Sequence, residues 1–300
     1  MKARNLNGQS GVTLIELLIA LAISSVLIAG IYRMFIQQQM TYATQEQVSD
    51  MQQNVRVAIN RMLREVRMAG YGGKNDNVGG VNDIITIFGN VNTYTNVITA
   101  ENNVIENGIT HDRITVVAAY DQIGTLNASA NAGDNTITVS YLNGSPFTSA
   151  NSKKKYLCLN GSNNYEIDVG NVAGGQVPLK AGVTLLESHS SGEPVFLVKA
   201  VTYGLHKDGT GTPVLYRNEN TGGGKQPVAD YIESLSLFYT LKDGTQTYTP
   251  ADPKQIRGVT VNMTARTENK DPDLAKVGDG YRRRTVTTYI DMRNMRDDPE

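Results

Sequence analysis

The chain begins with two segments of opposite character. Residues 1–11, MKARNLNGQSG, are polar and include Lys2 and Arg4 but no acid. Residues 12–32, VTLIELLIALAISSVLIAGIY, are apolar at almost every position, and Glu16 is the only charged side chain among them. A run of about twenty such residues is long enough to cross a bilayer as a helix. The two cations predict that the amino end stays in the cytoplasm and that the chain after Arg33 lies outside it.

The helical pattern continues beyond the apolar run. One face of residues 33–69 repeats apolar side chains at spacings of three and four, which indicates an amphipathic helix. These residues are Val48, Met51, Val55, Ile59, Met62 and Val66. The rest of that surface is mostly charged and is expected to face solvent or other subunits: Arg56, Arg61, Arg64, Glu65 and Arg67. No proline interrupts residues 12–69, and Gly70, Gly72 and Gly73 are expected to end the helix.

After residue 73 the apolar period changes from the helical value to two, with turn residues between the runs. Strands are predicted at residues 112–117 and 135–139, and residues 122–152 are otherwise expected to be loops. Later runs place apolar side chains on one face: Leu235, Leu237, Tyr239 and Leu241; Val259, Val261, Met263 and Ala265; Val286, Ile290 and Met292. The predicted fold is α+β, in which a long amino-terminal helix packs on an antiparallel sheet with loop insertions, and residues 70–300 form a β-rich head.

Composition and charge add few candidates for chemistry. The net charge of −1 gives no global signal for nucleic acid. Cys158 is the single cysteine and is expected to be buried. His111, His189 and His206 have no ligand spacing and are expected at the surface or at strand ends. Asp271, Asp273 and Asp279 lie in one loop, where a polar turn is favoured over a Ca²⁺ site. We therefore expect no catalytic site, no cofactor and no resident metal.

Glu16 is the residue that decides between interpretations of the amino terminus. A secretory signal would be cut at small residues after the apolar run, but Ala20-Leu21-Ala22 lies in the middle of it. A plain anchor explains the length but not the carboxylate, which costs about 2.5–3.5 kcal/mol near the centre of a membrane helix. Neither interpretation therefore accounts for the carboxylate of Glu16.

Residues 11–16, GVTLIE, resemble the cleavage and methylation motif of type IV prepilins. This resemblance implies that a prepilin peptidase removes residues 1–11 by cutting after Gly11 and methylates the new amino terminus at Val12. It also makes Glu16 the carboxylate of processing and assembly. Mature pilins more often begin with Phe or Met, so Val12 departs from the usual pattern.

Parts of the head resemble the minor pilins of the PilW type, although residues 75–195 match them poorly. The similar stretches are 68–71, 200–203, 211–217, 228–235, 257–261, 265–267, 281–284 and 292–294. Type II secretion pseudopilins of the J class share several of these stretches.

The resemblance implies a non-enzymatic minor pilin that helps to prime the assembly of a type IV pilus and is placed at its tip. Its implied partners are prepilin peptidase, the other minor pilins, the major pilin and the inner-membrane assembly platform; no nucleic acid is predicted. Before assembly, the chain would span the inner membrane once with a periplasmic head, and afterwards it would lie in the pilus at the cell surface. The alternatives are a type II secretion pseudopilin, a membrane-anchored periplasmic adhesin or sensor, and an exported enzyme.

Overall fold

The computed structural model of the protein describes residues 12–72, 96–147 and 156–295. Gly11, Gly73 and the lysine run at 153–155 lie outside these ranges. The chain divides into two units, Met1–Ser49 and Asp50–Glu300. The helix α1, Leu14–Arg67, begins in the first unit and ends in the second. The uninterrupted helix predicted from the absence of proline is thus confirmed.

Residues 50–67 of α1 bury one face against the sheets, as the apolar stripe predicted. Every stripe position from Met51 onward is buried, and Ala58 joins them on the same face. Val48, which belongs to the first unit, is half-buried. The chain leaves the helix through Gly70 and Gly72, whose φ angles of 78° and 92° suit glycine.

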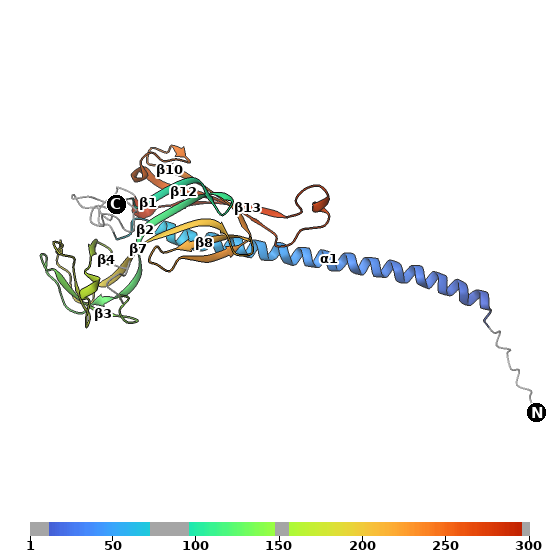
Figure 1. Cartoon of the computed structure of the whole chain (residues 1–300), viewed down its shortest axis with the longest axis horizontal. Helices are drawn as coiled ribbons and strands as arrows, with labels where there is room; N and C mark the ends of the chain where they lie inside the picture. The colour runs from blue at the N-terminus through green and yellow to red at the C-terminus, as the bar shows by residue number, and fades with distance from the viewer. Residues whose placement is uncertain (1–11, 73–95, 148–155, 296–300) are drawn as a thin grey trace, which may run out of the picture. The chain divides into compact units, whose positions relative to one another are not determined.

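A nine-stranded antiparallel sheet forms the larger layer (Figure 1). Its central order is β5-β4-β7-β2-β3-β6, while β1 pairs with β2, and β8 lies between β7 and β9. The bounds are β1 Ile98–Glu106, β2 Ile109–Leu126, β3 Thr136–Tyr141, β4 Tyr156–Leu159, β5 Asn163–Glu166, β6 Gln176–Pro178, β7 Pro194–Lys207, β8 Pro213–Asn218 and β9 Lys225–Asp230. The short 3-10 helix η2, Val169–Asn171, precedes β6.

A four-stranded antiparallel sheet follows in the order β11-β10-β12-β13. Its bounds are β10 Ile232–Leu241, β11 Gln246–Thr247, β12 Ile256–Arg266 and β13 Arg283–Asp291, with 3-10 turns η3 Pro253–Gln255, η4 Leu274–Lys276 and η5 Arg293–Met295. The predicted alternation holds in β12, where Val259, Val261, Met263 and Ala265 are buried. Asp112 of β2 links the two sheets, because its carboxylate accepts a hydrogen bond from the Leu237 amide at 2.8 Å.

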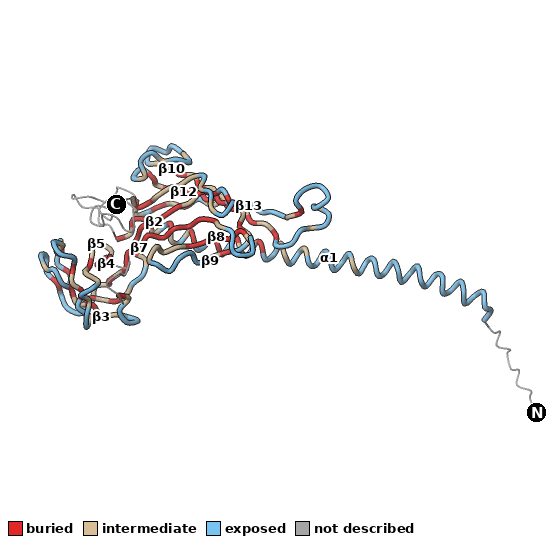
Figure 2. The backbone as a smooth tube through the Cα atoms, viewed as in Figure 1, coloured by how far each residue is buried: buried red, intermediate tan, exposed pale blue. Residues whose placement is uncertain are grey.

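The region predicted as loops between residues 122 and 152 is more ordered than the sequence suggested. The strand β2 continues to Leu126 across two irregularities in its pairing with β7, and β3 then pairs with its far end. The side chains of β2, β3, β4 and β7 build a separate apolar cluster there, which includes Leu126, Ile137, Leu157 and Leu197. Figure 2 shows the buried residues in red, and they lie mainly along the strands.

The residues that follow α1 form backbone hydrogen bonds with β2, a central strand of the larger sheet. The Gly70 amide donates to the Val117 carbonyl at 3.1 Å, and the Tyr71 carbonyl accepts from the Ala119 amide at 2.9 Å. Gly72 touches Cys158: a Cβ built on Gly72 would lie 2.9 Å from the cysteine sulfur. Cys158 is fully buried, as expected, and burial raises the pKa of its thiol to about 12.

Because the Cys158 thiol is inaccessible and protonated, it should not react with iodoacetamide at pH 8 in the folded protein. In about 8 M urea the same thiol should be alkylated fully, and mass spectrometry of the intact chain reads both states. Rapid modification of the native protein would contradict this placement of β4 against the end of α1.

Candidate processing and assembly segment

Thr13 and Glu16 close the amino end of α1 with reciprocal hydrogen bonds. The Thr13 amide and hydroxyl donate to Glu16 Oε2 at 2.8 and 2.9 Å, and the Glu16 amide donates to Thr13 Oγ1 at 3.3 Å. This is a capping box, in which a threonine at the cap and a glutamate three residues later satisfy donors that the first helical turn leaves free. The carboxylate is thus fixed in place by its own chain.

Only one oxygen of Glu16 takes part in this cap. Oε2 accepts both bonds from Thr13, whereas Oε1 accepts none from the residues that the structure describes. A carboxylate oxygen can accept up to two hydrogen bonds, so Oε1 remains able to receive an ammonium group. The capped geometry therefore presents half of the carboxylate to a cation from outside the chain.

The front of α1 exposes apolar side chains on every side. Large hydrophobic residues between Val12 and Phe35 are 53–79% exposed. Among the described residues, α1 is the one helix long and apolar enough to cross a membrane. The hydroxyl of Ser25 donates back to the Ala22 carbonyl at 2.7 Å, so this polar group is satisfied inside the helix.

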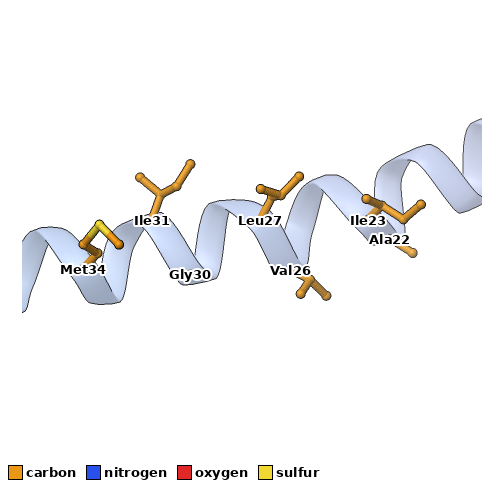
Figure 3. Close-up of a pocket in the computed structure, with 7 residues that line it drawn as sticks. All are labelled: Ala22, Ile23, Val26, Leu27, Gly30, Ile31 and Met34. Carbon is orange, nitrogen blue, oxygen red and sulfur yellow. The ribbon is translucent and has the colours of Figure 1, made fainter.

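A shallow apolar groove runs along one side of this segment (Figure 3). Gly30 faces open space, because a Cβ built there would meet nothing within 4 Å. The lining residues are Ala22, Ile23, Val26, Leu27, Gly30, Ile31 and Met34. Ala22 and Gly30 are the small residues of this lining, and small residues let a second helix approach closely in an apolar medium.

Glu65 lies at the other end of α1 and is not part of the solvated surface that the sequence suggested. Arg217 Nε of β8 donates to both Glu65 oxygens at 2.8 Å, and the Tyr203 hydroxyl of β7 donates to Oε2 at 2.6 Å. The side chains of Glu65 and Arg217 are 14% and 9% exposed. Figure 1 shows β7 and β8 beside this part of α1. We refer to Glu65, Tyr203 and Arg217 as the Glu65 cluster.

Further charges extend the cluster across the sheet. Arg217 Nη1 donates to Glu219 at 2.7 Å, and Lys199 pairs with Glu219 and with Asp121. Burial by itself would lower the pKa of Arg217, but its hydrogen bonds to Glu65 and Glu219 outweigh burial and raise that pKa. Burial, together with the Glu65 carboxylate, raises the pKa of the Tyr203 phenol. Both groups therefore keep their protons at neutral pH, and Tyr203 remains a donor.

The remaining sequence candidates do not come together as a site. His111 and His189 are 3% and 4% exposed, which corrects their assignment to the surface; His111 does lie near the start of β2. Residues distant in sequence lie beside both histidines: Gly204 of β7 is close to the His111 ring, and Ala130 pairs with His189. The spacing of histidines could not reveal these contacts. His206 is half-buried near the end of β7.

The three aspartates of the candidate Ca²⁺ loop are each engaged by a cation. Asp271 pairs with Arg282, Asp273 with Lys276 and Asp279 with Arg283. The Arg282 guanidinium lowers the pKa of Asp271, and Arg283 lowers that of Asp279. Within the described ranges, no cluster of three or more metal-ligating side chains occurs. The three carboxylates are thus paired with cations of the same loop and of the start of β13, as in a polar turn.

Residues 6–32 match the family model of the prokaryotic N-terminal methylation motif. The match includes Gly11, Val12 and Glu16, and the motif implies processing by a prepilin peptidase. The chain thus carries a type IV pilin-like methylation motif at the start of a long apolar helix, and the later part of that helix packs on antiparallel sheets.

No curated protein matches the chain. Among solved structures, a type IV-like pilin from Thermus thermophilus is similar at 10% identity over 81% of this chain and 95% of the other. The TM-score is 0.35, a likeness too low to bear on function or on the detailed topology.

The Glu65 cluster predicts a specific loss of stability. Replacing Glu65 with Gln leaves the buried Arg217 without one of its two carboxylates and should lower the free energy of unfolding by about 3 kcal/mol. Urea unfolding of the full-length protein in detergent micelles, followed by near-UV circular dichroism of its 15 tyrosines, would measure this.

The matched control is Arg64→Gln, because Arg64 is the exposed neighbour of Glu65 on α1 and has no partner among the described residues. Its free energy of unfolding should stay within about 0.5 kcal/mol of the wild-type value. Equal stabilities of the two variants would mean that the Glu65 cluster does not hold α1 on the sheet.

Proposed function

We propose that this chain is a minor pilin of a type IV pilus that helps to prime pilus assembly and stands at or near the pilus tip. The observation that carries the proposal is the methylation motif at residues 6–32, joined to an exposed apolar helix. A filament core is the environment that such a helix requires after it leaves the membrane, because its apolar side chains would otherwise face water.

The size and sequence of the head support the minor role. The second unit spans Asp50–Glu300, which is large for a subunit that repeats along a shaft. Most of the stretches that resemble PilW-type minor pilins fall on β7, β8, β9, β10, β12 and β13; one more follows α1, and another overlaps η5. Tyr203 and Arg217 belong to two of these stretches, so the resemblance falls on the strands that hold α1.

The processing steps follow from the chemistry of the amino end. Prepilin peptidase cuts after Gly11 and methylates Val12, and the resulting α-amine remains a cation after methylation. Inside a bundle of apolar helices an unpaired cation costs several kcal/mol, so the amine needs a carboxylate. The free Oε1 of a neighbouring subunit's Glu16 supplies it, while Thr13 keeps that carboxylate oriented through Oε2.

The partners and locations follow from the same sequence of events. Before assembly, the chain spans the inner membrane once with its head in the periplasm, where the assembly platform and the other pilins meet it. After assembly, the apolar segment lies against the helices of the major and minor pilins in the pilus.

Mass spectrometry of the mature protein should find a chain that starts at N-methylated Val12. Gly11→Val should leave residues 1–11 attached, because the peptidase site is then blocked by a branched side chain. Gly8→Val, a second leader glycine, should be processed normally. An intact Met1 terminus in the wild-type protein would overturn the processing claim.

A deletion strain, scored for surface pili and for protein secretion, tests the assigned machine. Loss of pili with normal secretion is the expected result. Loss of secretion alone would replace the proposal with a type II secretion pseudopilin, and no loss of either would favour a tethered adhesin or sensor.

The Glu16 variants test the pairing in the same strain. Glu16→Gln keeps an oxygen for the Thr13 cap but removes the charge, so the protein should fold and be processed, yet restore pili at least about tenfold less well than the wild type. Glu46→Gln, an exposed carboxylate farther along α1, should restore pili fully. Normal piliation with Glu16→Gln would show that the ion pair is not needed.

A further inference from the structure

A small cleft opens between α1 and the edge strand β13. It has a volume of about 170 Å³ and combines positive charge, amide groups and apolar walls. We call it the basic notch; its lining residues are Gln52, Val55, Arg56, Ile59 and Asn60 of α1, and Arg284 and Val286 of β13. The proposed processing steps involve none of these residues.

Strand alternation brings Arg284 to the notch. Residues 282–284 are three consecutive arginines, and the first two are neutralised: Arg282 pairs with Asp271, and Arg283 pairs with Glu233 and Asp279. Arg284 stands opposite Ala265 of β12 and therefore shares the face that carries Val286 toward the helix. It has no acidic partner among the described residues.

Arg56 is similarly without an acid. Its neighbours three and four positions away on α1 are Gln52, Gln53, Ile59 and Asn60, so no carboxylate stands within one helical turn. No ion pair joins Arg56 to any other described residue. Two guanidinium groups thus line one cleft, and no described residue supplies an anion to balance them.

An anion would turn this mutual repulsion into attraction. Guanidinium groups bind carboxylates through paired N–H donors, and the amides of Gln52 and Asn60 offer further donors. Val55, Ile59 and Val286 form walls that exclude water from part of the cleft, which strengthens charge interactions there. The lining therefore has the donors and the charge of an anion site.

The size and walls of the notch favour a carboxylate side chain over a nucleic acid. An Asp or Glu side chain places its methylene groups against the valine and isoleucine walls and its oxygens between the arginines. A nucleic acid would need a longer row of cations and aromatic surfaces on which bases stack, and no aromatic side chain lines the notch.

We propose that the basic notch binds an acidic side chain of an adjacent protein subunit. This rests on the proposed function in one respect, because a filament supplies the adjacent subunit. The contact would join the head of one subunit to its neighbour at the level of α1 residues 52–60, well away from the Glu16 pair at the amino end.

The binding test uses the full-length mature protein in detergent micelles and two probes, an acetylated hexaglutamate peptide and inorganic phosphate. Isothermal titration should show one peptide site. Arg56→Ala and Arg284→Ala should each weaken peptide binding about tenfold, and Arg56→Lys should weaken it less, because it keeps the charge and loses the paired donors.

Arg64→Ala is the matched control, since it removes the same charge from the same helix outside the notch. Its peptide affinity should change by less than about twofold. Equal losses with Arg64→Ala, no peptide binding, or phosphate binding as tightly as the peptide through the same arginines would each overturn the proposal.

The double variant Arg56→Ala/Arg284→Ala is then expressed in the deletion strain, and surface pili are scored. It should restore fewer surface pili than Arg64→Ala, with Val12 still processed. Full piliation by the double variant would overturn the assignment to a subunit contact. A failure of the proposed pilus function would instead appear as normal piliation in the deletion strain itself.

Discussion

The carboxylate of Glu65 is held between a guanidinium and a phenol of the larger sheet, and the position of the helix on that sheet depends on it. The apolar face of α1, from Met51 to Val66, holds the helix against the sheets through hydrophobic burial, which is not directional. The bonds from Arg217 and Tyr203 have direction, and they fix one rotation of the helix. The basic notch depends on that rotation, since it needs Arg56 beside β13.

The two ends of α1 use a glutamate in different ways. Glu65 is satisfied within the chain by a strand residue distant in sequence, so it contributes to folding. Glu16 is satisfied in part by Thr13, three residues before it, and its second oxygen accepts no hydrogen bond from the described residues. The difference lies in the surroundings: Glu65 is enclosed by the sheet, whereas Glu16 belongs to a helix with no layer of its own to cover it.

Distance along the chain separates the features that could be predicted from those that could not. The apolar run, the absence of proline and the stripe on α1 are local patterns, so the sequence predicted the helix and its buried face. The capping box is also local, and T-x-x-E at residues 13–16 could have been noticed as a helix start. Glu65 had no such signal, because its partners are 138 and 152 residues away. The buried histidines and the apolar cluster beyond Leu126 arise in the same way from pairings between distant strands.

The sequence by itself thus determined the amino-terminal motif, the long helix, the face that the helix buries and the alternation of the last strands. Each of these depends on the period of a single element or on the spacing of adjacent residues. The tertiary structure decided which charged side chains are paired: it joined Glu65 to Arg217 and gave acidic partners to Arg282 and Arg283. It also placed Arg56 of α1 and Arg284 of the edge strand β13 in one cleft, with no acidic partner among the described residues. Charge pairing acts over a few ångströms in space, and residues far apart in sequence reach that distance only when the strands are in register. The motif at Gly11 and Val12 is read from adjacent residues, whereas the free cations of the head become visible only in the fold.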